Sequence, residues 1–139
     1  MESPWTVDIL LVEDNEADIR LTKEGIAEAK IRNNLYVTRD GEEAMNFLFK
    51  RGNYKEAVTP DLILLDLNIP KKDGREILEG IKNDEVLSHI PVVILTTSEA
   101  EKDILKSYKL HANCYITKPM GMDKFVKIIQ AIEVFGSRS

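Results

Sequence analysis

The chain has 139 residues with a single cysteine, 43% of the residues are hydrophobic, and the formal net charge is −5. A chain of this length forms one ordinary domain and can bury a core without disulfides or a structural metal. The acidic balance is the opposite of the clustered Lys and Arg that bind nucleic acid, so we expect no nucleic-acid partner. The sequence shows no basic leader followed by a long apolar stretch and no apolar run of bilayer length. We therefore expect a cytoplasmic protein with no membrane contact.

Largely apolar runs alternate with helical patterns along the first half of the chain. Continuous apolar runs are typical of strands buried on both faces of a parallel sheet, and a capping residue followed three positions later by Glu is typical of a helix start. The expected elements are, in order, a strand at Val7–Val12, an irregular helix from Glu16 to about Lys30 that contains Gly25, a weaker strand at Leu35–Val37, and a helix capped by Asp40 and Glu43 that ends at Gly52.

The second half repeats this alternation. Its expected elements are a strand at Leu62–Leu65, a helix capped by Asp73 and Glu76, a strand at Val92–Leu95, a helix capped by Ser98 and Glu101 with Ile104, Leu105 and Tyr108 on one face, a weaker strand at Tyr115–Ile116, and a helix from about Met122 to Phe135 with an apolar stripe of Met122, Phe125, Ile129 and Ile132. Alternating strands and helices imply right-handed βαβ crossovers. We therefore expect an α/β fold, a doubly wound five-stranded parallel sheet of order 2-1-3-4-5, flavodoxin-like (βα)5.

Polar or charged residues follow four of the five expected strands. In an open doubly wound sheet, ligands bind outside the carboxyl ends of the strands, so side chains at these positions are expected to converge. They are Glu13 and Asp14 after the first strand, Asp66 after the third, Thr96 after the fourth and Lys118 after the fifth.

The three acidic residues of this group predict a cation site. Two carboxylates about 4 Å apart repel by roughly 4 kcal/mol at an effective dielectric constant near 20. A hard divalent ion with oxygen ligands and retained waters offsets this repulsion, and Mg²⁺ is the expected ion. In this interpretation Asp14 is a direct ligand, Glu13 binds directly or through water, Asp66 supplies one oxygen, and the carbonyl of Asn68 supplies another.

Asp66 is also the expected nucleophile, because it directly ends the most apolar strand and a carboxylate can form an aspartyl phosphate. Phosphoryl transfer requires mainly alignment and charge neutralisation, which Lys118, the Thr96 hydroxyl and backbone N–H groups would assist. Taken singly, each residue also has a structural interpretation: Glu13 and Asp14 as a helix cap, Thr96 as a strand end, and Lys118 as a solvated side chain. Their joint occurrence at one edge of the sheet favours the functional interpretation.

These motifs resemble the receiver domain of bacterial and archaeal two-component response regulators, from about Val7 to Phe135. The motifs that carry the resemblance are Leu10–Asn15, Pro60–Pro70, Asp73–Gly74, Pro91–Thr96 and Lys118–Pro119. No linker leads to a second patterned region, so we expect residues 1–139 to form one receiver domain with its core at about 7–135 and no output domain.

The resemblance also implies roles for individual residues. A sensor histidine kinase would transfer a phosphoryl group to Asp66, after which Thr96 would move inward together with Tyr115, the aromatic switch residue. The Lys118–Pro119 peptide bond would be cis, which an X-Pro bond permits at a cost of about 0.5–1 kcal/mol. The purely structural interpretation of Tyr115 is an interfacial ring that packs against the preceding helix.

Within the family, the sequence is similar to the small response regulators that serve phytochrome-type kinases. The similarity rests on Leu65–Glu76 and Asn113–Tyr115. This chain has Phe135–Gly136 where those regulators often carry an aromatic pair, which leaves kinases of other sensor classes open as partners. Many receivers pair through the face made by helix 4, strand 5 and helix 5, and a homodimer of this chain would be expected to use that face.

Two other functions compete with this interpretation. An enzyme resembling the haloacid dehalogenase phosphatases needs an acid two residues after the nucleophile, where this chain has Asn68, and it needs a cap domain. A degenerate receiver that binds partners without phosphorylation is hard to reconcile with the complete set of site residues. We therefore expect a phosphoacceptor with at most slow autodephosphorylation, and not an enzyme.

Overall fold

The computed structural model describes residues 6–67, 69, 71, 74–107, 112 and 114–136, with only the backbone described at 104–107 and 133–136. Its centre is a parallel sheet of five strands in the order β2-β1-β3-β4-β5. This order confirms the fold predicted from the sequence. The strands are β1 (Val7–Val12), β2 (Asn33–Thr38), β3 (Leu62–Asp66), β4 (Val92–Thr96) and β5 (Cys114–Thr117).

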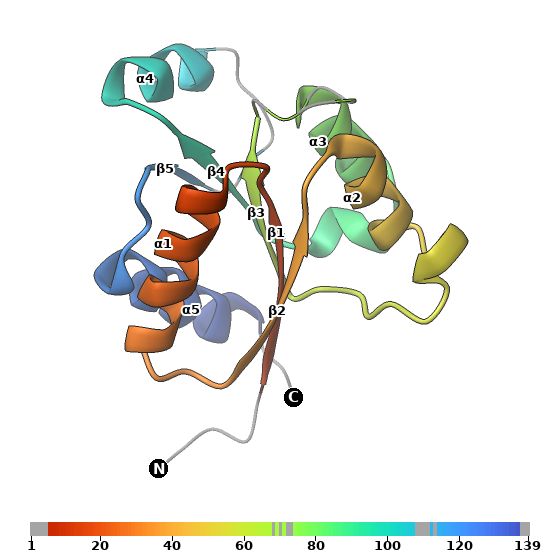
Figure 1. Cartoon of the computed structure of the whole chain (residues 1–139), viewed down its shortest axis with the longest axis horizontal. Helices are drawn as coiled ribbons and strands as arrows, with labels where there is room; N and C mark the ends of the chain where they lie inside the picture. The colour runs from red at the N-terminus through yellow and green to blue at the C-terminus, as the bar shows by residue number, and fades with distance from the viewer. Residues whose placement is uncertain are drawn as a thin grey trace.

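Helices cover both faces of the sheet. α1 and α5 lie on one face, and α2 and α3 lie on the other (Figure 1). The helices are α1 (Glu16–Glu28), α2 (Gly41–Leu48), α3 (Gly74–Lys82), α4 (Glu99–Ser107) and α5 (Met122–Gly136). Two short 3₁₀ turns, Gly52–Tyr54 and Leu87–His89, were not predicted from the sequence. Because every strand is parallel, the carboxyl ends of all five meet at one edge of the sheet.

The core consists of two apolar layers, one on each face of the sheet. Alternate residues of β1 show the division, since Ile9 and Leu11 belong to the layer under α1 and α5, whereas Leu10 and Val12 belong to the layer under α2 and α3. All four of these side chains are fully buried. The strand is therefore sandwiched between helices, which explains its nearly continuous apolar sequence.

The central strands were predicted more accurately than the edge strands. β1 has the predicted limits, and β3 and β4 each extend one residue further, to Asp66 and Thr96. The edge strands β2 and β5 are longer than predicted and have several half-buried positions. Edge strands have only one neighbour, so their apolar runs are interrupted by partly exposed residues.

Helix α2 begins as predicted and ends earlier than predicted. The Asp40 carboxylate caps the helix by accepting a hydrogen bond from the Glu43 N–H at 2.7 Å. The expected end at Gly52 is wrong, because Lys50 adopts a positive φ of 56° and the helix ends at Leu48. The N–H groups of Lys50 and Arg51 then bond back to carbonyl groups of the last turn, as in a Schellman motif with Lys in the position usually taken by Gly.

Helix α1 passes very close to the loop that connects β5 with α5. A methyl group at Gly25 would lie 2.6 Å from the Met120 carbonyl oxygen, so this crossing requires glycine. The Gly25 that makes the helix pattern irregular is therefore what allows α1 to approach this loop. The Lys118–Pro119 bond in the same loop is cis, as the resemblance implied.

Other details of the helices differ from expectation or lie outside the described residues. Phe125, Ile129 and Ile132 are buried on α5, but Met122 is 38% exposed, so the predicted stripe begins one turn later. The expected cap at Asp73, the Tyr108 position and the side chains of Ile104 and Leu105 lie outside the described residues. None of the helices that the structure describes combines the length and apolarity needed to cross a membrane.

Candidate functional site

Three carboxylates meet at the carboxyl edge of the sheet. β1 and β3 are neighbours, and their register pairs Val12 with Leu65, so Glu13 and Asp66 follow in adjacent positions. One carboxylate oxygen from each of Glu13, Asp14 and Asp66 lies within 4.8 Å of the others. Glu13 and Asp66 are buried, whereas Asp14 is exposed and forms the solvent side of the group. The sequence prediction that Asp14 and Asp66 lie close together is confirmed.

The Lys118 ammonium reaches this acidic group from the end of β5. Its Nζ lies 2.7 Å from Glu13 Oε1 and 2.9 Å from Asp66 Oδ2. The contact to Glu13 is a close ion pair without the direction of a good hydrogen bond. A third carboxylate, Asp18 Oδ2, lies 2.9 Å from the same Nζ. One ammonium therefore faces three acidic side chains.

Burial and the surplus of acidic side chains both shift the pKa values of this site. The pKa of Glu13 is raised to about 7, chiefly by burial and also by Asp66, against the Lys118 ammonium, which lowers it. Burial alone would lower the pKa of Lys118, but its close contacts with the Glu13, Asp66 and Asp18 carboxylates outweigh burial and raise it. Lys118 is therefore firmly protonated, and its single charge does not fully compensate the acids around it.

Thr96 and Tyr115 lie beside this group on the α2–α3 face of the sheet. Thr96 is buried, and its hydroxyl lies 3.3 Å from the Ser98 carbonyl oxygen and 3.4 Å from that of Ile116. Tyr115 is half-buried, packs against the core layer of this face, and pairs in register with Ile94. Burial raises the pKa of its phenol above the ordinary value. Asp66 pairs in register with Leu95, so Thr96 lies one position further along β4. The Thr96 hydroxyl hydrogen-bonds to β5, the strand that carries Tyr115.

Sequence reasoning found the residues at the strand ends and missed Asp18. Asp18 lies in the first turn of α1, where its N–H donates to the Asn15 side chain at 2.9 Å. Its position three residues after a capping Asn is a signal for a first-turn acid, but nothing in the sequence shows that Lys118, 100 residues later, lies beside it. Asn68, expected to supply a carbonyl ligand, lies outside the described residues.

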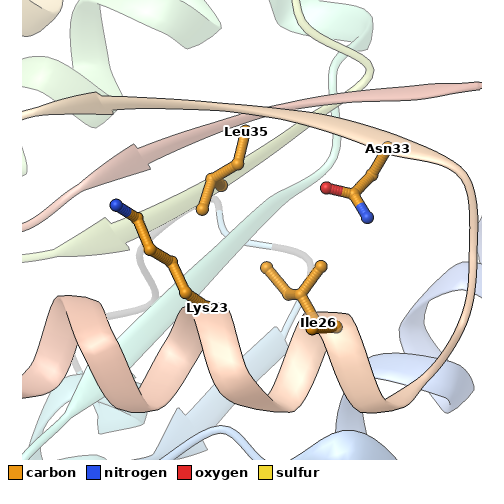
Figure 2. Close-up of a pocket in the computed structure, with 5 residues that line it drawn as sticks. Lys23, Ile26, Asn33 and Leu35 are labelled. Atoms are coloured by element: carbon orange, nitrogen blue, oxygen red, sulfur yellow. The ribbon is translucent and has the colours of Figure 1, made fainter.

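A hollow lies away from the acidic group. It has a volume of about 200 Å³ and is bordered by α1 and the edge strand β2. Lys23 and Ile26 extend from the helix toward Leu35 and Asn33 on the strand (Figure 2). No carboxylate is among the residues that line this hollow, so it offers no acidic nucleophile and no acidic metal ligand.

The acidic group has the donor set that a hard divalent ion requires. Such ions prefer carboxylate oxygens, and Mg²⁺ is usually held by one or two carboxylates and several waters. Glu13 and Asp66 provide buried oxygens, and the exposed Asp14 leaves room for water on the outer side. The residues present therefore fit a divalent metal ion.

Comparisons with known proteins agree with this geometry. A family model described as the response regulator receiver domain matches residues 9–130. The chain is 51% identical over 127 residues to the response regulator Rcp1 of Synechocystis sp., covering 91% of this chain and 86% of Rcp1. It is also similar to the solved structure of the phosphorylated cyanobacterial phytochrome response regulator RcpA, with a TM-score of 0.75, 52% identity and 94% of each chain covered.

A further solved structure is relevant to the acidic group. The Mn²⁺-bound form of Rcp1 matches this chain with a TM-score of 0.74 and 49% identity over 96% of each chain. The family-model match spans well over half of the chain, and the Rcp1 similarity extends over nearly all of it. The chain therefore belongs to the response regulator receiver domain family of two-component signalling proteins.

Proposed function

We propose that this chain accepts a phosphoryl group on Asp66 from a sensor histidine kinase, in a reaction that depends on Mg²⁺. The observation that carries this proposal is the meeting of three carboxylates with one ammonium at the carboxyl edge of the sheet. A structural salt bridge needs only one acid for one base. The surplus of negative charge, with Asp14 open to solvent, is what a site for a cation and a phosphoryl group requires.

The chemistry is a simple displacement at phosphorus. An Asp66 carboxylate oxygen attacks the phosphorus of the donor, a new O–P bond forms, and the bond from phosphorus to the donor breaks with its electron pair leaving on the donor. Asp66 is suited to this role because its carboxylate is buried but held by the Lys118 ammonium at 2.9 Å. When bound, Mg²⁺ would supply positive charge to the oxygens of the transferred group. Glu13, Asp14 and Asp66 would hold it, with the Asn68 carbonyl as a further proposed ligand.

The phosphorylated state is proposed to act through Thr96 and Tyr115. The Thr96 hydroxyl bonds weakly, at 3.3 and 3.4 Å, to backbone carbonyls and can exchange them for a phosphoryl oxygen. The Thr96 carbonyl also accepts a hydrogen bond from the Lys118 N–H at 2.8 Å. A movement of Thr96 would therefore also shift the end of β5. Phosphorylation adds about −1.5 to −2 charges, and it changes a distant surface only by favouring one of two packings.

The partners are proposed from the relatives. Rcp1 and RcpA are response regulators, and RcpA is described as a phytochrome response regulator, so a phytochrome-type histidine kinase is the proposed phosphoryl donor. The signal would leave by protein contact, and a homodimer would use the face of α4, β5 and α5. We propose no catalytic turnover beyond slow loss of the phosphoryl group. A receiver that works without phosphorylation would not need the charge surplus around Asp66.

Acetyl phosphate, a small phosphoryl donor, tests the proposal directly. Wild-type protein incubated with acetyl phosphate and Mg²⁺ should gain the mass of one phosphoryl group in an intact-mass measurement, and a chelator should prevent the gain. Asp66→Asn should gain nothing, whereas the control Asp61→Asn, at the opposite end of β3, should gain the same mass as wild type. A gain that persists in Asp66→Asn would overturn the assignment.

A further inference from the structure

The Asp18 carboxylate is placed differently from the equivalent acids of two other helices. Glu43 and Glu101 each lie three residues after a capping side chain, as Asp18 does. In α2 and α4 the acid turns back and accepts the N–H of the residue before the cap, at 2.7 Å from Arg39 to Glu43 and at 3.4 Å from Thr97 to Glu101. These two acids therefore stabilise the start of their own helix.

In α1 the first-turn acid has a different partner, and Glu13 accepts the N–H of the capping residue itself. The Asn15 N–H donates to Glu13 Oε2 at 3.3 Å, and the Asp18 carboxylate lies 2.9 Å from the Lys118 ammonium. Asp has one methylene fewer than Glu, which shortens its reach toward the cap. The first-turn acid of α1 thus contacts the site instead of its own helix start.

Asp18 also differs from the other two acids that contact Lys118. Glu13 and Asp66 belong to the group whose oxygens can share a metal ion, and Asp66 is the proposed acceptor. Both would change partners during metal binding and phosphorylation. The Asp18 side chain is outside that group and 30% exposed, whereas the Lys118 side chain is 11% exposed. Of the three acids that contact Lys118, Asp18 is therefore the one whose partner would change in neither event.

We propose that Asp18 is a positioning residue, which holds the Lys118 ammonium at the site while Asp66 changes from a carboxylate to an acyl phosphate. The inference rests on the proposed phosphorylation of Asp66. In the resting protein Lys118 is shared by three acids, and after transfer one of its contacts must pass from Asp66 Oδ2 to a phosphoryl oxygen. A contact that persists on both sides of the reaction limits how far the ammonium has to move. Asp18 itself does not touch the reacting atoms.

Three variants and a matched control test this role. Asp18→Asn removes the charge and keeps the shape, and Asp18→Glu restores the charge. The control Glu16→Gln removes an acid from the same helix turn, where Glu16 pairs with Arg39 and not with Lys118. Asp18→Ser provides a second neutral variant, with a residue that the start of a helix tolerates well.

The first readout uses metal-free protein and needs no phosphorylation. The ammonium protons of Lys118 are observed by ¹⁵N NMR, and the signal is assigned by its loss in Lys118→Arg. An ion-paired, mostly buried ammonium exchanges its protons slowly with water. We expect exchange to become several-fold faster in Asp18→Asn and Asp18→Ser and to remain as in wild type in Glu16→Gln.

The second readout is the initial rate of mass gain with acetyl phosphate. We expect a loss of about threefold to tenfold in Asp18→Asn, the size of one charge-assisted contact, with recovery in Asp18→Glu and no change in Glu16→Gln. The Mg²⁺ concentration that gives half the maximal rate should stay the same, because Asp18 is outside the metal group.

Wild-type exchange and a wild-type rate in both neutral variants would overturn the role of Asp18. An equal loss of rate in Glu16→Gln would also overturn it, because the loss would then follow from removing any negative charge in this helix turn and not from the contact with Lys118. If wild type itself gained no mass, the proposed function would fail and the inference with it. That outcome is distinguishable, since it appears before any variant is compared.

Discussion

At the scale of single residues, the site contains more acidic side chains than the one ammonium of Lys118 can compensate. Its ammonium lies within 2.9 Å of oxygens from Glu13, Asp18 and Asp66. Removing the ammonium would leave buried carboxylates that repel each other. Such uncompensated burial costs more than the net value of the original ion pair, because the desolvation of the remaining charge is no longer offset.

Lys118→Met is therefore expected to lower the free energy of unfolding of the metal-free protein by about 3 kcal/mol. Adding Mg²⁺ should restore part of the loss, because a divalent ion offsets the same repulsion. Chemical denaturation with and without Mg²⁺ measures both effects. The exposed Lys124, which donates to the Thr117 carbonyl, provides the control variant Lys124→Met, expected to have little effect. A loss in Lys118→Met no larger than in this control would contradict the interpretation.

Tyr54 gives a residue-scale prediction about pH. Burial and the hydrogen bond to Glu43, at 2.8 Å, together raise the pKa of its phenol from the ordinary 10.0 to about 12. A phenol with a raised pKa keeps its proton longer in the folded protein than in the unfolded chain. Its contribution to stability is therefore complete below pH 10 and is lost as the pH rises from 10 toward 12.

The difference in tyrosinate absorbance between wild type and Tyr54→Phe isolates this titration. We expect the difference to develop near pH 12 in wild type and at lower pH in Glu43→Gln, which lacks the carboxylate. A Tyr54 component that titrates near pH 10 in the folded wild type would show that the phenol is neither buried nor paired as described.

At the scale of elements, what the sequence predicts depends on how each element is buried. The central strands β1, β3 and β4 are enclosed on both faces and between neighbours, so their apolar runs mark their limits well. The edge strands β2 and β5 were predicted too short because their exposed positions interrupt the pattern. The end of α2 was misplaced because Lys50, not a glycine, takes the left-handed conformation there.

The crossing of α1 over the β5–α5 loop gives a prediction at this scale. Gly25→Ala should destabilise the protein by roughly 1–3 kcal/mol, even though alanine favours helix formation, because the new methyl group would meet the Met120 carbonyl oxygen at 2.6 Å. Gly121→Ala is the matched control, since nothing lies within 4 Å of a methyl group there. Chemical denaturation of the two variants measures the difference. A neutral or stabilising Gly25→Ala would mean that α1 does not approach the loop this closely.

At the scale of the whole molecule, the sheet order is what turns separate sequence motifs into a site. The positions of Glu13, Asp14 and Asp66 were predictable because parallel strands share one carboxyl edge and β1 neighbours β3. The contact of Asp18 with Lys118 was not predictable, because it depends on how a helix on one face meets a loop that follows an edge strand. Strand order follows from general rules of topology, whereas such a contact depends on the packing of particular side chains.

The position of the phosphoryl group is the most direct test of this account. Borohydride reduces an aspartyl phosphate to an alcohol and releases the phosphate, so the modified aspartate becomes homoserine. After incubation with acetyl phosphate and Mg²⁺, reduction and proteolysis, peptide sequencing by mass spectrometry should find homoserine at position 66 and unmodified Asp14 and Asp18. Homoserine at another aspartate, with residue 66 unchanged, would contradict the central claim that the acidic group serves Asp66 as the acceptor.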